Sequence, residues 1–335
     1  MRLRIIIPLA LILALLPFVG AVRAETSLLR QADEAPLIML IDGDFWAWSE
    51  VPARFDQLTT SGHNARPALS PDGARLAYTS VAAIAVAALD QPGGIGDADP
   101  PTDIWVLDLA SGEAALAAGQ PEGASFMAEG VPDNYIVRSA PAWSPDGSML
   151  VWMEHGAVED AYRLVAYDLA GSSLKTIVPD LPLQAGVPGI TDPRWGSGGI
   201  ALHLTIFDET IDRFEEAFLI YDMNGVLLAD ARQPAGEGGA VVDMLWAEVG
   251  GQDYLAAVYS SGTGLLIEPA TGATQPADAL PHIYSRALGA ASPTVYFRPR
   301  FDAESGLRFG WWYLPAAQMT PSQLPFEGRA RQIAL

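Results

Sequence analysis

The sequence predicts an all-β chain built from copies of one antiparallel unit, and three observations lead to this prediction. The stretch from Ala68 to Tyr78 recurs as Ala142 to Trp152, and each copy combines a strand end, a Ser-Pro-Asp-Gly turn and an apolar strand. Short apolar stretches separated by turn residues continue along the rest of the chain. No helical stretch of about 10–15 residues separates them, which argues against a parallel α/β sheet. About six units of roughly 40 residues match the period of β-propeller blades.

The turn is the best-defined part of each unit. Proline presets φ at the first turn position, aspartate can hydrogen-bond to its own backbone, and glycine adopts positive φ without steric cost. We therefore assign a structural role in the turns to Ser70, Asp72, Gly73, Ser144, Asp146 and Gly147.

The units follow one another along the chain in a common order of strands. The clear strands are expected at residues 37–41, 45–48, 76–80, 104–109, 149–153, 164–169, 174–178, 199–207, 218–222, 241–246, 254–260, 264–269, 283–288, 294–297 and 310–314. The partial unit at 37–59 lacks an innermost strand, which we expect residues 331–335 to supply. The predicted fold is therefore a single propeller of six four-stranded blades over residues 25–335, and the pattern allows five to seven.

The first residues predict export. Two arginines precede an apolar run from Ile5 to Val22, and Val22-Arg23-Ala24 places small residues where a signal peptidase cleaves. We expect a signal peptide at 1–24 and a periplasmic or extracellular protein. The alternative is an uncleaved anchor that retains the chain at the membrane, because the run is close to spanning length.

Composition narrows the classes of partner. The chain has 40 acidic and 19 basic residues and a formal net charge of −21. Such a surface repels nucleic acid and anionic lipid, so neither is a predicted partner. The chain has no cysteine, which excludes thiolate nucleophiles and thiolate metal ligands.

The turn motif resembles a known repeat. Pro141 to Met153 reads Pro-x-Trp-Ser-Pro-Asp-Gly followed by an apolar strand, and this is similar to the TolB-type β-propeller repeat. Pro67 to Tyr78 matches with Leu69 in place of tryptophan, whereas the later units have lost the motif. The resemblance implies a propeller, and it implies that the motif residues close turns without touching ligand. Proteins similar to TolB include protein-binding periplasmic scaffolds, propellers fused to peptidases, and a few enzymes acting on sugars.

Local motifs for catalysis are weak. Gly196-Ser197-Gly198-Gly199 has the wrong spacing for a nucleophile elbow. The spacings of His63, His155, His203 and His282 match no local metal signature, although distant residues can converge on a propeller axis. Asp42-Gly43-Asp44 suits a hairpin turn better than a calcium site. We therefore predict no catalytic residue, no metal site and no cofactor.

The axial channel is the first predicted binding region, because residues that lead into each innermost strand face it. The candidate ligand-binding residues are Arg66, Arg138, Asp192, Asp243 and Arg286, with His155 from what we expect to be an adjoining loop. The alternative is a water-filled channel whose charges pair with one another.

Two long segments form the second predicted binding region. Residues 81–102 and 114–137 are too long for hairpin loops, and we expect both over one face, where loops of a regular scaffold usually bind ligands. We therefore expect an exported, monomeric, non-catalytic scaffold that binds another protein at the cell envelope or outside the cell. The alternative function is a polysaccharide lyase or hydrolase with its site at the channel mouth.

Overall fold

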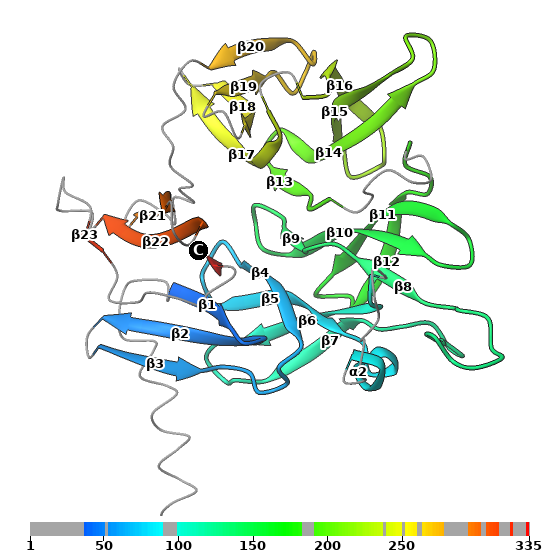
Figure 1. The fold of residues 1–335 in the computed structure, drawn as a ribbon, viewed down its shortest axis with the longest axis vertical. Coiled ribbons are helices and arrows are strands. Elements are labelled where there is room, and N and C mark those ends of the chain that lie inside the picture. The colour runs from blue at the N-terminus through cyan, green and yellow to red at the C-terminus, as the bar shows by residue number, and fades with distance from the viewer. Residues whose placement is uncertain are drawn as a thin grey trace, which may run out of the picture.

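The computed structural model describes residues 37–50, 53–89, 99–182, 191–236, 239–249, 252–259, 263–277, 294–302, 306–314, 322–323 and 333–334. This part of the chain forms six antiparallel sheets and one short helix, α2 (Ala83–Leu89). In Figure 1 the sheets surround a common centre. The predicted signal peptide at 1–24 lies outside the described residues, among which no helix is long and apolar enough to cross a bilayer.

We number the sheets in chain order. Sheet 1 has the order β24-β1-β2-β3, formed by Ile333–Ala334, Leu37–Ile41, Asp44–Glu50 and Ala53–Gln57. Sheet 2 contains β4 (Asn64–Leu69), β5 (Arg75–Val81), β6 (Thr102–Asp108) and β7 (Ala114–Ala118). Sheet 3 contains β8 (Ile136–Arg138), β9 (Ala142–Trp143), β10 (Met149–Gly156), β11 (Ala161–Asp168) and β12 (Ser173–Val178).

The remaining three sheets repeat this pattern. Sheet 4 contains β13 (Arg194–Gly196), β14 (Gly199–Asp208), β15 (Arg213–Tyr221) and β16 (Leu227–Pro234). Sheet 5 contains β17 (Val241–Val249), β18 (Gln252–Tyr259), β19 (Gly264–Ile267) and β20 (Thr274–Ala277). Sheet 6 contains β21 (Thr294–Asp302), β22 (Gly306–Leu314) and β23 (Ser322–Gln323).

Consecutive sheets pack face to face, and the core is the series of interfaces between them. Between sheets 1 and 2, the rings of Phe45 and Tyr78 meet edge to face at 5.0 Å. The interface between sheets 2 and 3 is built around the fully buried Trp152. Sheets 3 and 4 share a third cluster, and sheets 4 and 5 share a fourth around Phe218. Short antiparallel meanders stacked in chain order are the architecture of a β-propeller.

The Ser-Pro-Asp-Gly turns have the same hydrogen bonds in both copies. In the first, the Gly73 amide donates to the Ser70 carbonyl at 2.8 Å, and the Ser70 hydroxyl donates to Asp72 at 2.5 Å. Gly73 has φ of 67°, a conformation that glycine adopts without strain. The second copy repeats these contacts at Ser144 and Asp146.

One residue links the two turns. Arg75, which follows the first turn, donates from Nη2 to the Gly147 carbonyl in the second turn at 2.8 Å. Its guanidinium also lies 5.0 Å from the centre of the Trp143 ring. Trp143 in turn donates its indole N–H to the Ala68 carbonyl at 2.8 Å. Sheets 2 and 3 are therefore joined by polar contacts as well as by apolar packing.

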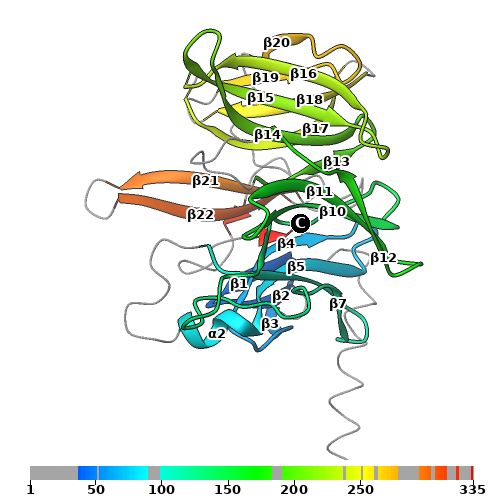
Figure 2. The same cartoon turned by 90° about the vertical axis from the view of Figure 1, so that its right-hand side faces the viewer.

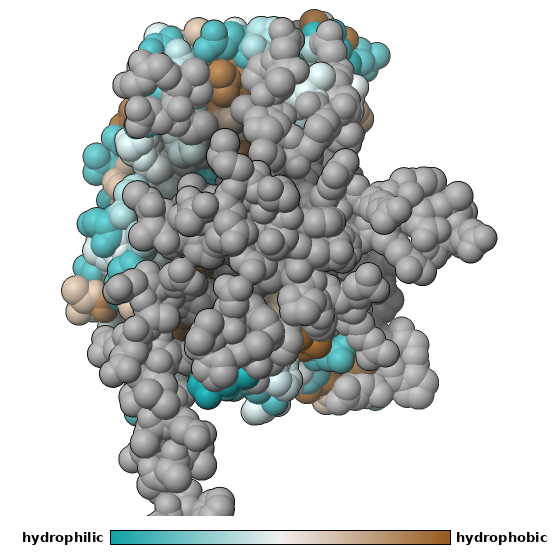
Figure 3. Space-filling model, turned by 90° about the vertical axis from the view of Figure 1, so that its left-hand side faces the viewer, coloured by the Kyte–Doolittle hydropathy of each residue, from teal (hydrophilic) through white to brown (hydrophobic). Residues whose placement is uncertain are grey.

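Alternating strand direction gives the molecule two different faces. The connections β5–β6, β7–β8 and β10–β11 leave one end of the sheets, and we call this end the loop face. The Ser-Pro-Asp-Gly turns leave the opposite end, which we call the turn face. On the side of the molecule seen in Figure 3, the described hydrophobic residues form only small separate groups among hydrophilic ones.

The structure corrects the boundaries of the two long segments. The segment predicted as a loop at 114–137 contains β7 and the start of β8, so the connection itself covers only 119–135. The sequence of β7 is Ala-Ala-Leu-Ala-Ala, whose first three residues are exposed, so it lacks the alternation of a half-buried strand. The other segment, 81–102, contains α2.

Candidate binding face

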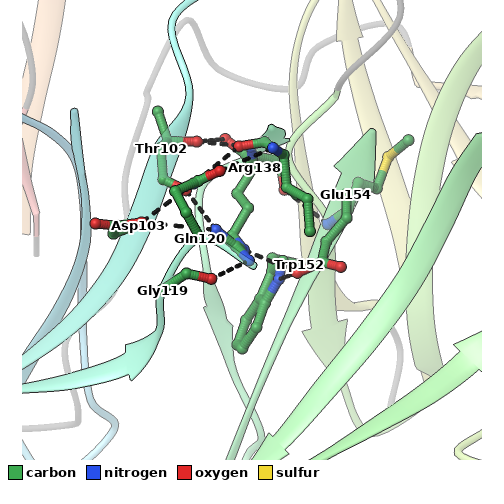
Figure 4. A network of polar contacts seen from close by, with 10 residues as sticks. Thr102, Asp103, Gly119, Gln120, Arg138, Trp152 and Glu154 are labelled. Atoms are coloured by element: carbon green, nitrogen blue, oxygen red, sulfur yellow. Dashed lines mark hydrogen bonds and ion pairs between the residues drawn. The ribbon is translucent and has the colours of Figure 1, made fainter. Parts of the chain in front are cut away.

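A buried polar network lies beneath the loop face, between sheets 2 and 3 (Figure 4). At the end of β8, Arg138 donates from Nε to Glu154 Oε1 at 2.8 Å. Its Nη1 donates to the Thr102 carbonyl at 2.5 Å, and its Nη2 donates to the Gly119 carbonyl at 2.9 Å. Trp152 donates its indole N–H to the same Glu154 oxygen at 3.0 Å.

This placement corrects the prediction that Arg138 faces the channel. Its side chain is 2% exposed, and each of its guanidinium nitrogens donates to a protein oxygen. A charge this deeply buried is stable only when it is paired and hydrogen-bonded. The contacts therefore favour a structural role in joining sheets 2 and 3.

Gln120 extends the network to the connection 119–135. Its amide nitrogen donates to the carbonyls of Thr102 and Ile136 at 2.9 and 3.1 Å, and its Oε1 accepts the Ile136 N–H at 2.8 Å. It also donates to Asp103, where burial raises the pKa of the carboxyl against the opposing effects of Gln120 and Arg138. Both ends of the connection are thus fixed on one polar network.

The connection 119–135 has its own internal structure. The backbones of Ser125 and Asn134 exchange two hydrogen bonds of 2.9 Å, and Asp133 accepts the Met127 N–H at 2.7 Å. Phe126 is buried against the Tyr135 ring, with ring centres 5.0 Å apart. Met127 has φ of 51°, which an L-residue adopts only where the surroundings hold it.

Four apolar side chains of the loop face are exposed to solvent. Met127 is 56% exposed and Val131 is 53% exposed, both in the connection 119–135. Val158, between β10 and β11, is 67% exposed, and Ile84 on α2 is 36% exposed. We call Ile84, Met127, Val131 and Val158 the apolar set of the loop face.

Helix α2 adds further exposed apolar surface to this face. Its sequence, Ala-Ile-Ala-Val-Ala-Ala-Leu, has no polar residue, yet only Ala85 is buried. Figures 1 and 2 both place α2 beside the connection 119–135. A fully apolar helix usually packs in a core, whereas here Ile84 is exposed and Val86 and Leu89 are only half-buried.

Aromatic and acidic side chains lie next to the apolar set. His155 stacks on Tyr162 with ring centres 4.3 Å apart, and its Nε2 lies 3.0 Å from Asp160 Oδ1. The pKa of Tyr162 is raised by burial, then by the charges of Asp160 and Asp99. The structure also places His155 within β10 rather than in the expected loop, because the strand continues to Gly156.

Two charged residues and one backbone N–H group, from three neighbouring sheets, meet at Asp192. Arg66 Nη1 lies 3.4 Å from Asp192 Oδ1, and both side chains are more than a third exposed. The same Asp192 oxygen accepts the Ala140 N–H at 2.9 Å. These residues precede or lie in the innermost strands of sheets 2, 3 and 4, so Arg66 and Asp192 lie side by side, and their role in binding a ligand stays a prediction. The pairing also fits the alternative in which channel charges neutralise one another.

The side chains of the two other predicted ligand residues are not described by the structure. Asp243 lies on β17, and its side chain is outside what the structure describes. Arg286 lies outside the described residues. Within the described ranges no group of three or more His, Cys, Asp or Glu could hold a metal ion.

The histidine on β14 has partners within its own sheet. His203 pairs with Glu216, and its ring stacks on that of Phe218 with ring centres 5.1 Å apart.

Among solved structures, β-propeller proteins are similar to this chain. No family model matches the chain, and no curated protein matches it. TolB from Acinetobacter baumannii is similar at 14% identity and a TM-score of 0.47, over 89% of this chain and 65% of that one. An oligogalacturonate lyase from Vibrio parahaemolyticus is similar at 11% identity and 0.47, over 84% of this chain and 70% of that one. The chain thus spans less than two thirds of the TolB chain, and these likenesses assign no family and no chemistry to it.

Proposed function

We propose that this protein is a non-catalytic β-propeller that binds another protein through its loop face. The apolar set carries the proposal, because four exposed apolar side chains stand on connections fixed by a buried polar network. Ordered apolar groups on a surface lose little conformational entropy on binding and typically mark interaction sites.

The proposal includes a closed ring of six TolB-like blades. Support comes from β24, which pairs with β1 through Ile38–Ala334 and Met39–Ile333, next to the start of the ring. Such pairing of the two chain ends removes an open sheet edge, which would otherwise invite pairing with other chains.

The proposal also includes export and a monomeric state. Residues 1–24 have the pattern of a secretory signal, which supports a location in the periplasm or outside the cell. The partner would then be an envelope or extracellular protein.

Site-specific photocrosslinking in the native cells tests this function. A benzoylphenylalanine at position 158 reports on the loop face, and one at position 174, on β12, is the control because Leu174 is also exposed. We expect a covalent adduct with one protein from position 158 and none from 174, identified by mass spectrometry.

Three outcomes contradict the proposal: no adduct from position 158, equal adducts from both positions, or cleavage of a polysaccharide by the purified chain. The last outcome would instead support the lyase or hydrolase alternative, and a companion assay of glycan size detects it directly.

A further inference from the structure

The described parts of the connections that carry the apolar set have charged side chains of one sign. The described parts of the connections β5–β6, β7–β8 and β10–β11 contain no Lys or Arg. They contain six carboxylates: Asp99, Glu122, Glu129, Asp133, Glu159 and Asp160. A partner that covers the apolar set must therefore approach a negative surface.

Half of these carboxylates are occupied within the molecule. Glu159 pairs with Arg163 at 2.9 Å, and Asp160 lies 3.0 Å from His155. Asp133 accepts the Met127 N–H. Asp99, Glu122 and Glu129 form no ion pair with the described residues, so they can meet a partner's charge without breaking an internal one.

The negative potential extends across the face. The pKa of Tyr135 is raised by burial, then by the charges of Asp133 and Asp99. Asp99 also contributes to the raised pKa of Tyr162 on β11. Asp99 thus affects a tyrosine in the connection 119–135 and a tyrosine on β11, and the described parts of the three connections contain no Lys or Arg.

This combination discriminates between classes of partner. Acidic polymers, including uronate-containing glycans, would be repelled by like charge at short range. A purely basic segment would satisfy the carboxylates and leave α2 and Met127 in water. A segment with apolar side chains on one side and Lys or Arg along its edges would satisfy both features.

We propose that the partner presents a basic, amphipathic segment to the loop face, with its apolar side chains on the apolar set and its cations beside Asp99, Glu122 and Glu129. This inference rests on the proposed function and names the chemistry of its partner. Complementary charge would speed association and orient the segment, and apolar contact would supply most of the affinity.

Binding of a model peptide to the full mature chain tests the inference. The probe is a fluorescein-labelled peptide of lysine and leucine in helical period, compared with a glutamate and leucine peptide of the same pattern. Fluorescence anisotropy should show binding of the lysine peptide only. Added salt should weaken it, since exposed charges are screened.

Matched variants locate the binding. The double variant E122Q/E129Q should raise Kd roughly fivefold, as expected for two exposed charge contacts. The control E113Q/E268Q removes the same charge from the turn face and should leave Kd unchanged. M127S/V158S should raise Kd at least about tenfold, whereas L174S/V226S, which changes two exposed apolar side chains on the turn face, should leave Kd unchanged.

The outcomes separate this inference from the proposed function. Equal weakening by both charge pairs, or no weakening by M127S/V158S, would mean attraction to net charge alone and would overturn the inference. A crosslinked partner at position 158 together with no binding of the lysine peptide would overturn the inference and leave the proposed function standing. Unchanged melting temperatures of all four variants rule out unfolding as the cause.

Discussion

The turn face and the loop face use the same residue types for different purposes. On the turn face, carboxylates are bound within the chain: Asp72 and Asp146 accept from the serine and the backbone of their own turns, and Asp222 accepts two backbone N–H groups. On the loop face, Glu122 and Glu129 point to solvent beside exposed apolar groups. The turns thus use these carboxylates to hold the backbone, whereas Glu122 and Glu129 on the loop face are exposed and form no ion pair with the described residues.

The buried network between the faces should give the largest effect. Arg138→Ala leaves the Glu154 carboxylate buried without its cation, which costs about 3–5 kcal/mol of unfolding free energy. The pair of Arg54 and Asp56, whose side chains are 33% and 32% exposed, is the control, and Arg54→Ala should cost less than about 1 kcal/mol. Urea denaturation measures both, and equal losses would contradict the structural role of Arg138.

Ring closure should give the next largest effect. Deleting residues 331–335 removes β24 and exposes the edge of β1. We expect a loss of about 2 kcal/mol, or roughly 4 °C in melting temperature for a domain of this size. An unchanged melting temperature in calorimetry would show that the ring does not depend on this strand.

The two faces can be compared directly by replacing one carboxylate on each face with alanine and measuring the loss of unfolding free energy. Asp72→Ala breaks the bonds from the Ser70 hydroxyl and the Ala74 N–H, and should cost about 1 kcal/mol. Glu122→Ala should change stability by less than about 0.5 kcal/mol, since surface positions without such contacts tolerate change. Similar losses at both positions would remove the distinction between the faces.

The smallest effect is a dependence of stability on pH. The Ser144 hydroxyl, followed by the Ser148 N–H and hydroxyl, lowers the pKa of Asp146 from 3.8 to about 2. Because the folded pKa lies below the unfolded value, the contribution is present above pH 3.8 and is lost as the pH falls toward 2. The difference in melting temperature between the wild type and Asp146→Asn should become smaller as the pH falls over this range. A difference that stays constant would contradict the lowered pKa of Asp146.

What could be predicted from the sequence depends on how local each interaction is. The Ser-Pro-Asp-Gly turns close through contacts within five residues, so residue type alone indicates them. The all-β class follows from strand periodicity in the same way. In contrast, β7 and α2 are rich in alanine, which does not produce the alternation of apolar and polar residues that marks a strand. Neither element was predicted from the sequence.

The candidate binding face depends on contacts between residues far apart in the sequence, which no local pattern contains. Arg138 meets Thr102 and Gly119 only because sheets 2 and 3 are neighbours, so its burial could not be read from the chain. For helix α2 the sequence contains one indication of an exposed apolar surface, an apolar run inside a connection that should be polar. For Met127 and Val158 the sequence contains no such indication, because single apolar residues in loops are common.

The contact of Arg75 with the second turn has a consequence for unfolding. Because Arg75 bonds to Gly147 and lies over Trp143, opening either hairpin exposes groups that belong to the other. Sheets 2 and 3 should therefore exchange their backbone hydrogens with deuterium as one cooperative unit, and Arg75→Ala should separate that unit into two with different protection. The connections of the loop face that join the strands of sheets 2 and 3 would then stand on a single cooperative unit.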